Sequence, residues 1–356
     1  MYADNIYHLI VLSILFLLSL SYLLIGFVVA LRIINNFRAK QQKIFLNKWE
    51  SLIFSFLEND ELPEELVAKI PRRKYKYLLN YLREYLLTLG GKDFERLSSL
   101  INQTKLTDYL LKKLKSWNKS NITFASFFVG ITGIDAAKPL LQKNIKSHNQ
   151  QMFFSSAVAL AKINSYDSLD LILHEFIKFN NLGDDYLLLI LTEFHENICQ
   201  EIINLLTVEI SSSLATTFLR VLRYYKYQIA GPTVLKMLVY SHLTDVIIEC
   251  LKFIEEIKYE KAAFAVSRLL DHKLPGIRIQ AIKTISKLEN KSFEAKIFTK
   301  LFETNYDVQY QAALAILNHF DDGEKELSDL AYSVDKGNSA AISRMLLSEK
   351  RVKEGK

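Results

Sequence analysis

The most regular pattern of apolar and polar positions lies between Glu260 and Phe320, where one helical hairpin is followed by another. Residues 263–271 predict a first helix, a break containing a proline follows at His272–Gly276, and Ile277–Leu288 predict a second helix. The second helix has apolar residues at i, i+4, i+8 and i+11, with a small residue among them: Ile277, Ala281, Ile285 and Leu288. This spacing places them on one face of a helix and predicts a buried stripe.

The same stripe recurs along the chain in steps of 31 residues. It repeats at Val308, Ala312 and Ile316, and stepping back from Ala281 reaches Cys250, Leu219, Leu188, Ala157 and Ser126. Three positions beyond these anchors the residue is apolar in all units but one, and four positions before them only Asp184 interrupts the apolar row. The expected first helices keep the step at Leu141, Ile172, Ile203, Val234, Ala265, Lys296 and Leu327. We therefore predict an all-α fold, an α-solenoid of helical hairpins with a period of about 31 residues.

The run Leu269–Asn290 resembles a HEAT-like repeat of the short kind, about 30 residues long, that also occurs in bilin-lyase-type proteins. It has residues at the usual aspartate, proline, aliphatic, arginine and alanine positions: Asp271, Pro275, Ile277, Arg278 and Ala281. The next unit repeats the pattern at Asp307, Val308 and Ala312, but Gln309 stands in place of the arginine. The resemblance covers roughly residues 120–347 and implies an architecture rather than an activity, although the lyases suggest a ligand-binding groove.

A long apolar segment opens the chain. Between Asn5 and Leu31 there is no acidic or basic residue apart from His8. As a helix, the 23 residues 9–31 would be about 34 Å long, enough to cross a hydrocarbon core of about 30 Å. We predict a transmembrane helix at residues 9–31, preceded by a short extracytoplasmic N-terminus at residues 1–8. A cleaved signal peptide is the alternative, but Asp4 stands where its basic start would be.

Basic residues follow the apolar segment closely and predict its orientation. The residues that we expect near the membrane are Arg32, Arg38, Lys40 and Lys43, all of which precede the next acidic residue, Glu50. Nothing basic except the amino terminus lies ahead of the segment. By the positive-inside rule the N-terminus is outside and the bulk of the chain is cytoplasmic.

Four further segments complete the predicted organisation. They are a basic and then amphipathic juxtamembrane helix at residues 32–58, a helical cap at 59–119, the HEAT-like solenoid at 120–347 and a charged tail at 348–356. The cap should begin with an acidic turn at residues 58–65, followed by helices whose spacing does not match the repeats. Terminal units of solenoids are commonly atypical.

Positive charge is concentrated in the first third of the chain. Residues 1–119 contain 18 Lys and Arg and 11 Asp and Glu, a surplus of seven, so a net charge of +6 leaves about −1 for the remainder. The run Arg72–Lys76 would either be attracted to an anionic inner leaflet or form a solvated helix face. Residues 167–209 hold nine acidic residues and one basic residue, which form either a surface for a basic partner or a solubilising face.

Two groups of residues are candidates for a partner surface. The first is a basic and aromatic run near the expected second helix at residue 219: Arg220, Arg223, Tyr224, Tyr225 and Tyr227. We expect at least one of its tyrosines to pack between repeats and the others to contact a protein. The second group comprises polar residues on the concave surface formed by the second helices: Arg278, Gln280, Lys283, Gln309 and Gln311. Arg278 is alternatively a contact between repeats.

Motifs for chemistry are missing from the sequence. His195 and Cys199 have the spacing of two zinc ligands on a helix but supply only two, and the glycines form no phosphate-binding loop. Cys199 and Cys250 lie in apolar helical surroundings, as buried thiols do in a reducing compartment. We therefore predict no catalytic residue, no cofactor and no metal, and do not expect an enzyme.

Together these features predict a membrane-anchored HEAT-repeat scaffold or adaptor that binds a protein partner, such as a membrane-associated enzyme or envelope system, at the cytoplasmic face. A small-ligand-binding or lyase-like HEAT protein is one alternative, and it would need a deep, closed pocket. A nucleic-acid-binding protein is the other, and the near-neutral charge after residue 119 argues against it.

Overall fold

A computed structural model describes residues 2–58, 63–179, 182–288, 291–333 and 337–353. In the first helix, the side chains of residues 2–11, 13, 38, 39, 41–49, 51 and 52 lie outside this description. The described residues form α-helices and short 3₁₀ helices, with no strand among them. They divide into two compact units, residues 1–140 and 141–356.

The first unit contains the apolar segment and the cap. Its helices are α1 (Tyr2–Glu58), α2 (Pro63–Ala68), α3 (Tyr75–Thr88), α4 (Gly91–Asn102), α5 (Lys105–Leu114) and α6 (Lys119–Ile131), with α7 (Lys138–Ile145) at its boundary. The short helix α2 corrects the prediction of an acidic turn. Its two central apolar residues, Leu66 and Val67, are buried, and six residues are too few to show a helical period in the sequence.

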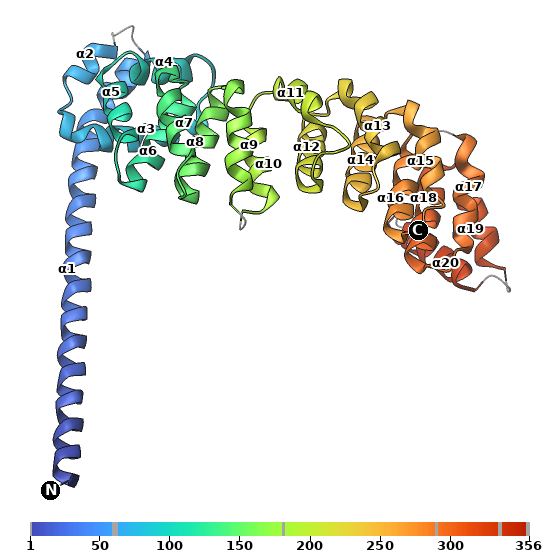
Figure 1. Ribbon diagram of the computed structural model, residues 1–356, viewed down its shortest axis with the longest axis horizontal. Helices are drawn as coiled ribbons and strands as arrows, with labels where there is room; N and C mark the ends of the chain where they lie inside the picture. The colour runs from blue at the N-terminus through green and yellow to red at the C-terminus, as the bar shows by residue number, and fades with distance from the viewer. Residues whose placement is uncertain (1, 59–62, 180–181, 289–290, 334–336, 354–356) are drawn as a thin grey trace. The chain divides into compact units, whose positions relative to one another are not determined.

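Helix α1 is continuous over 57 residues and carries the apolar segment into the cap (Figure 1). Within it, Ile14–Phe37 is a 24-residue window of mean hydropathy 2.7, none of which is buried against the protein. The last turns of α1 pack on the cap. Ile53 and Phe56 are buried there, and the ring of Phe54 meets that of Tyr85 edge to face with centroids 6.3 Å apart.

Arg96 of α4 fastens the end of α1 to the cap. Its guanidinium donates a 2.6 Å hydrogen bond to the carbonyl oxygen of Phe56 and lies 5.2 Å from the centre of the Phe56 ring. That carbonyl belongs to the last turn of α1, where the helix dipole favours a cation. The end of α1 is thus held by the cap rather than joined to it by a loose linker.

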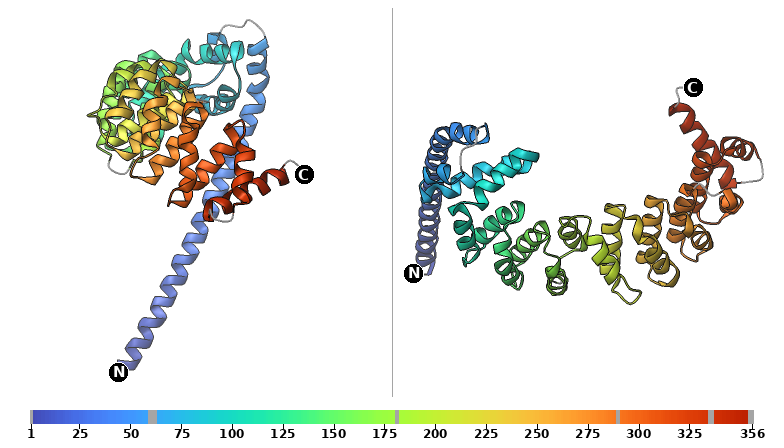
Figure 2. Two further views of the ribbon diagram at one scale, coloured as in Figure 1. Left: turned by 90° about the vertical axis from the view of Figure 1, so that its right-hand side faces the viewer. Right: turned by 90° about the horizontal axis from the view of Figure 1, so that it is seen from above.

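The second unit is a stack of helical hairpins that follow one another in chain order (Figures 1 and 2). Its first helices are α9 (Leu169–Ile177), α11 (Ile198–Leu205), α13 (Gly231–Tyr240), α15 (Ala263–Leu269), α17 (Glu294–Thr299) and α19 (Gly323–Ala331). Its second helices are α8 (Gln150–Lys162), α10 (Asp184–Thr192), α12 (Ser212–Tyr224), α14 (Thr244–Ile257), α16 (Pro275–Lys287), α18 (Tyr306–His319) and α20 (Gly337–Lys353). The HEAT-like α-solenoid is confirmed.

The central residue of the stripe predicted on each second helix is buried in all repeats but one. Exposure is 0% at Ser126, Ala157, Leu219, Cys250, Ala281 and Ala312. Leu188 is only half-buried, because α10 begins four residues before it, at Asp184, whereas α16 begins six residues before Ala281. Asp184 is therefore the first residue of a shorter helix rather than a core position, and it accepts a 2.5 Å hydrogen bond from Ser213 Oγ of α12.

The first helices are shorter and less regular than the second. α17 has six residues and α15 has seven, compared with 13 in α16. The predicted row is buried at Leu141, Ile172, Val234 and Leu327. In the other three repeats the buried residue is the one next to the predicted position in the sequence: Ile202, Val266 and Ile297. The apolar stripe of a two-turn helix contains only about two residues. Such a helix can rotate about its axis by one residue position, relative to the second helices, at little cost in buried apolar surface.

A residue in the left-handed conformation follows the second helix at four of the described turns: Gly133, Asn164, Lys226 and Lys258, with φ between 50° and 69°. The next residue in each case donates a hydrogen bond of 3.0–3.1 Å to the carbonyl oxygen five residues before it. This is the Schellman ending of a helix. Gly133 therefore terminates α6 and turns the chain toward the next first helix.

We predict that Lys258→Gly stabilises the protein. The left-handed conformation costs a side-chain-bearing residue about 1 kcal/mol, and the greater freedom of glycine in the unfolded chain offsets part of this, leaving a gain of about 0.5 kcal/mol. Urea unfolding of the full chain measures it. The matched control is Lys283→Gly, an exposed lysine inside α16, which should lose about 1 kcal/mol. Equal losses in both variants would contradict the prediction.

Candidate interaction surface

Successive second helices pack directly on one another and form one continuous side of the second unit. Contacts join α8 to α10, α10 to α12, α12 to α14, α14 to α16, α16 to α18 and α18 to α20. Among the described first helices, neighbouring helices contact each other much less, and α13 with α15 is the pair with the most contacts. The second helices are thus the more closely packed row. We call their outward side the second-helix surface.

Charged residues on the second-helix surface pair across neighbouring helices. The pairs are Arg220 of α12 with Asp185 of α10 (2.7 Å), Arg223 of α12 with Glu249 of α14 (3.3 Å), and Lys287 of α16 with Glu255 of α14 (2.6 Å). Each pair joins two repeats and cancels charge at the surface. Because the pairs are partly exposed, each contributes no more than about 1 kcal/mol to stability.

The structure separates the tyrosines predicted at the end of α12. Tyr225 packs between repeats, where its hydroxyl donates to the carbonyl oxygens of Phe194 and Thr192, and burial raises its pKa to about 12. Tyr227 is half-buried. Tyr224 is 65% exposed and meets the Tyr225 ring edge to face at 5.0 Å. Tyr224 therefore offers the largest exposed surface of the three.

Arg278 and Gln309 are engaged inside the stack. Arg278 donates to the Glu303 carboxylate at 2.9 Å and to the carbonyl oxygen of His272 at 2.8 Å. Gln309 donates to the carbonyl oxygen of Glu303, six residues before it, just as His272 lies six residues before Arg278. The two residues make the same contact in successive repeats, so their polar groups bind within the protein rather than extending toward a partner.

Of the other predicted polar residues, Gln280 is buried and donates to Glu255 Oε2 at 2.7 Å, whereas Lys283 is exposed and Gln311 half-buried. Lys283 and Gln311 line a cavity of ≈ 370 Å³ between α14, α16 and α18. A second cavity, of ≈ 330 Å³, adjoins it and shares three of its residues: Ser286, Asn318 and His319. We call the two cavities together the α16–α18 groove.

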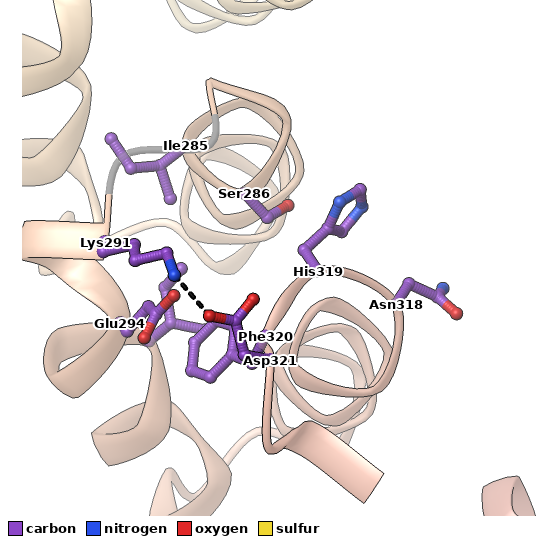
Figure 3. Close-up of a pocket in the computed structure, with 9 residues that line it drawn as sticks. Ile285, Ser286, Lys291, Glu294, Asn318, His319, Phe320 and Asp321 are labelled. Atoms are coloured by element: carbon purple, nitrogen blue, oxygen red, sulfur yellow. Dashed lines mark hydrogen bonds and ion pairs between the residues drawn. The ribbon is translucent and has the colours of Figure 1, made fainter.

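Figure 3 shows the second of these cavities, on the side nearer α17. Lys291 forms an ion pair with Asp321, and Glu294 lies beside them. His319 and Asn318 point away from this ion pair. The apolar walls include Ile285 and Phe320. The groove thus presents donors, acceptors and both signs of charge along its length, which suits an extended polypeptide better than one small molecule.

Sequence reasoning missed Ser286, Asn318 and His319, because polar residues at helix ends are ordinary. One signal was present: Lys287 and Asn318 are 31 residues apart and hence occupy equivalent positions in successive repeats. Comparison of polar residues at each repeat position would have pointed to this end of α16 and α18.

The two thiols are buried and unreactive. Burial raises the pKa of Cys199 to about 12 and the pKa of Cys250 also above its usual value, so both stay protonated at neutral pH. His195 is exposed, whereas Cys199 is fully buried, so the two do not form a ligand pair. Across the described residues, no three His, Cys, Asp or Glu side chains lie close enough to hold a metal ion.

The four membrane-proximal basic residues all belong to α1. Arg32 and Lys40 are exposed, and the side chains of Arg38 and Lys43 lie outside the described residues. Contact between these residues and a membrane stays a prediction.

An acidic cavity of ≈ 490 Å³ lies between α17 and α19, with carboxylates from Glu294, Glu326 and Asp329. Glu326 is the most constrained of them. Its Oε2 is buried and accepts no hydrogen bond within the described residues. Burial raises the pKa of Glu326, and Glu294 and Asp322 raise it further.

We predict that Glu326→Gln stabilises the protein at neutral pH. Because the folded pKa of Glu326 exceeds its unfolded value, the ionised carboxylate costs stability above the folded pKa, and the cost vanishes below the unfolded pKa. The thermal midpoint should rise by about 2 °C at pH 7.5, and the advantage should disappear near pH 3.5. The control, Glu324→Gln, breaks a 2.7 Å ion pair with Lys350 and should bring no gain. A gain that is the same at both pH values would contradict this.

No protein-family model matches the chain, and no curated protein is significantly similar to it. Several solved structures, among them the following three, are similar to it over part of its length. The complex of CpcE and CpcF of phycocyanin lyase from Nostoc sp. PCC7120 is 14% identical, with 68% of this chain and 93% of that chain covered and a TM-score of 0.29. Kap121p bound to Nup53p is 12% identical over 82% of this chain and 44% of that chain, with a TM-score of 0.37.

The third similar structure is an engineered protein, 16% identical over 80% of this chain and 82% of that chain, with a TM-score of 0.31. Of Kap121p, the chain covers less than half of the length. The HEAT-like fold itself is established by the stacked hairpins and their period.

Proposed function

We propose that the protein is a single-span membrane protein whose HEAT-like solenoid binds a protein partner at the cytoplasmic face. The observation that carries the membrane part is the window Ile14–Phe37, in which no residue is buried. Leu15, Phe16, Leu23 and Phe27 are each more than half exposed. Leaving this much apolar surface in water is unfavourable, whereas a hydrocarbon core about 30 Å thick would cover it.

The continuity of α1 supports a retained anchor over a cleaved signal sequence. The helix runs without a break from the apolar window to Glu58, and its last turn is held by Arg96 and packs on Tyr85. A signal sequence is removed during secretion and needs no such attachment to the mature fold. The basic residues that follow residues 9–31 support a cytoplasmic solenoid.

The second-helix surface supports a protein partner over nucleic acid. Arg220 and Arg223 are already paired with carboxylates, so they add little to a positive field. Exposed aromatic and apolar side chains lie on the same helices: Tyr186 and Leu189 of α10 and Tyr224 of α12. Such residues are typical anchors at protein interfaces. A tether also raises the effective concentration of the solenoid toward partners at the same membrane, so we propose an adaptor role without catalysis.

Membrane insertion predicts that the full chain stays in the pellet after alkaline carbonate extraction and dissolves only in detergent. Arginine at both Leu18 and Leu24 should release it, since each charge costs about 3 kcal/mol at the centre of a span. Sidedness is tested with Lys261→Cys, an exposed position in a protein whose own thiols are buried. An impermeant maleimide should label it only after the membrane is opened. Extraction of the unmodified chain by carbonate, or labelling of intact cells, would overturn the proposal.

Partner binding predicts that Tyr224→Ala combined with Lys283→Glu lowers recovery of a specific protein crosslinked in intact membranes. Loss of about 2 kcal/mol of interface energy would reduce the recovered partner about 30-fold, with no change in thermal midpoint. The control is Lys236→Glu, an exposed lysine on the first helix α13, which should leave recovery unchanged. Arg278→Ala should instead lower stability by about 2 kcal/mol, because Glu303 loses its closest cationic partner and keeps only the longer ion pair with Lys300 (3.6 Å). If no specific protein is recovered, the adaptor role fails.

A further inference from the structure

The cap carries a second set of basic residues, apart from those that follow the apolar window. One part of the set lies in the 3₁₀ helix Arg72–Lys74 and the first turn of α3, and the other lies where α5 connects to α6. All side chains of this set are exposed, and that of its one tryptophan, Trp117, is completely exposed (101%). We call the set the basal surface: Arg72, Arg73, Lys76, Lys115, Trp117 and Lys119.

Helix α3 runs in the same direction as α1. Phe54 meets Tyr85, and one turn earlier in both helices Glu50 lies close enough to Tyr81 to help raise the pKa of its hydroxyl. The offset is 31 residues in both pairs (85 − 54 and 81 − 50), so residue numbers rise together along the two helices. The start of α3, with Arg72 and Arg73 ahead of it, therefore points back toward the apolar window.

The basal surface lies near the level at which the apolar window ends. Glu50 is 13 residues beyond Phe37, which is about 20 Å along α1. Arg73 is eight residues before Tyr81, which is about 12 Å back along α3. The remaining axial distance is about 8 Å from Phe37 and about 17 Å from Leu31, the end of the predicted span. The headgroup layer occupies about 5–7 Å of this distance, and the Debye length at physiological ionic strength is about 8 Å. The charge of Arg73 therefore acts on headgroups around the end of the span.

Helix α6 brings Trp117 to the same end of the cap. Lys76 lies over the ring of Phe124 (6.0 Å) and Arg83 over the ring of Phe127 (4.3 Å), so α6 runs in the same sense as α3. Figure 1 shows α6 at the end of the first unit that is nearer to the N-terminal half of α1. Tryptophan among lysines is typical of the interface between membrane and water.

Arg72 and Arg73 of the basal surface are placed where the fold itself does not favour a cation. The first turn of α3 contains no acidic residue, and no side chain caps it, so the helix dipole acts against positive charge at this end. In the described part of the chain, neither Arg72 nor Arg73 pairs with a carboxylate. Folding stability therefore does not account for them, whereas an external anionic surface does.

We propose that the basal surface docks on anionic lipid headgroups in the leaflet where the span ends. The proposal rests on the membrane anchoring proposed above and adds a second contact, which holds the cap against the bilayer instead of letting it pivot on α1. The arginines and lysines approach lipid phosphates, and the indole of Trp117 lies among the headgroups with its N–H toward a polar acceptor.

The test uses the two tryptophans of the chain. In the full-length Trp49→Phe variant, Trp117 is the sole tryptophan. This variant is reconstituted into nanodiscs of phosphatidylcholine, with or without phosphatidylserine, that carry a nitroxide-headgroup lipid. We expect Trp117 fluorescence to be quenched in the anionic discs and far less in the neutral discs, with the difference lost in 0.5 M salt. Adding Arg73→Glu should lower the ratio of docked to undocked cap at least about fivefold.

The control is Lys92→Glu, an equal change of charge at an exposed residue beyond the other end of α3, which should leave quenching unchanged. Arg73→Glu should not lower the thermal midpoint, since it removes a charge that the helix dipole disfavours. If Arg73→Glu does unfold the cap, the proposal is tested by the Trp49→Phe variant alone, from how its Trp117 quenching depends on salt and on lipid charge. If Trp117 is unquenched in both kinds of disc, as expected for a surface that binds protein or nucleic acid, the docking is overturned. If it is quenched equally in both, the docking on anionic lipid is also overturned. Either result leaves the membrane anchor standing. A chain that cannot be reconstituted refutes the anchor instead.

Discussion

One constraint underlies the second unit: a helical hairpin of this kind cannot bury its apolar stripe alone. The stripe on each second helix has a small or medium residue at its centre, such as Ala281 or Cys250, and these residues are fully buried only because another second helix packs on either side. The period of 31 residues is the sequence record of that dependence. Helix α20, the last of the described second helices, has an exposed polar face that includes Asn338, Arg344 and Glu349.

The first unit answers a different requirement, because an apolar helix and a folded cap share one continuous element. Packing of Ile53 and Phe56, together with the bond from Arg96 to the end of α1, makes the direction of α1 a property of the cap. Parallel packing of α3 on α1 then determines which end of the cap is nearer to the apolar window. Positive charge and an exposed tryptophan gather at that end, although they come from two separate connections in the chain.

Pairing between repeats decides how much of the surface remains for partners. Arg278, Gln280 and Gln309 look like surface residues in the sequence, yet each is bonded to a neighbouring helix or turn. Lys283 and Tyr224 remain exposed. Many polar side chains of the solenoid are therefore bonded between or within its repeats. The polar and aromatic residues that stay exposed define where another protein can bind.

Local pattern by itself determined the helices, their period, the small-centred stripe and the apolar segment, because each depends on residues a few positions apart on one helix face. It did not determine that α10 starts late at Asp184, or that the Arg278 guanidinium is bonded to Glu303. Those outcomes depend on partners 25 or more residues away, on where each helix begins, and on how neighbouring helices rotate to meet. The tertiary structure alone placed Lys283 and Gln311 on one groove, and brought Arg73 and Trp117 to one end of the cap, because only packing relates helices that the sequence lists separately.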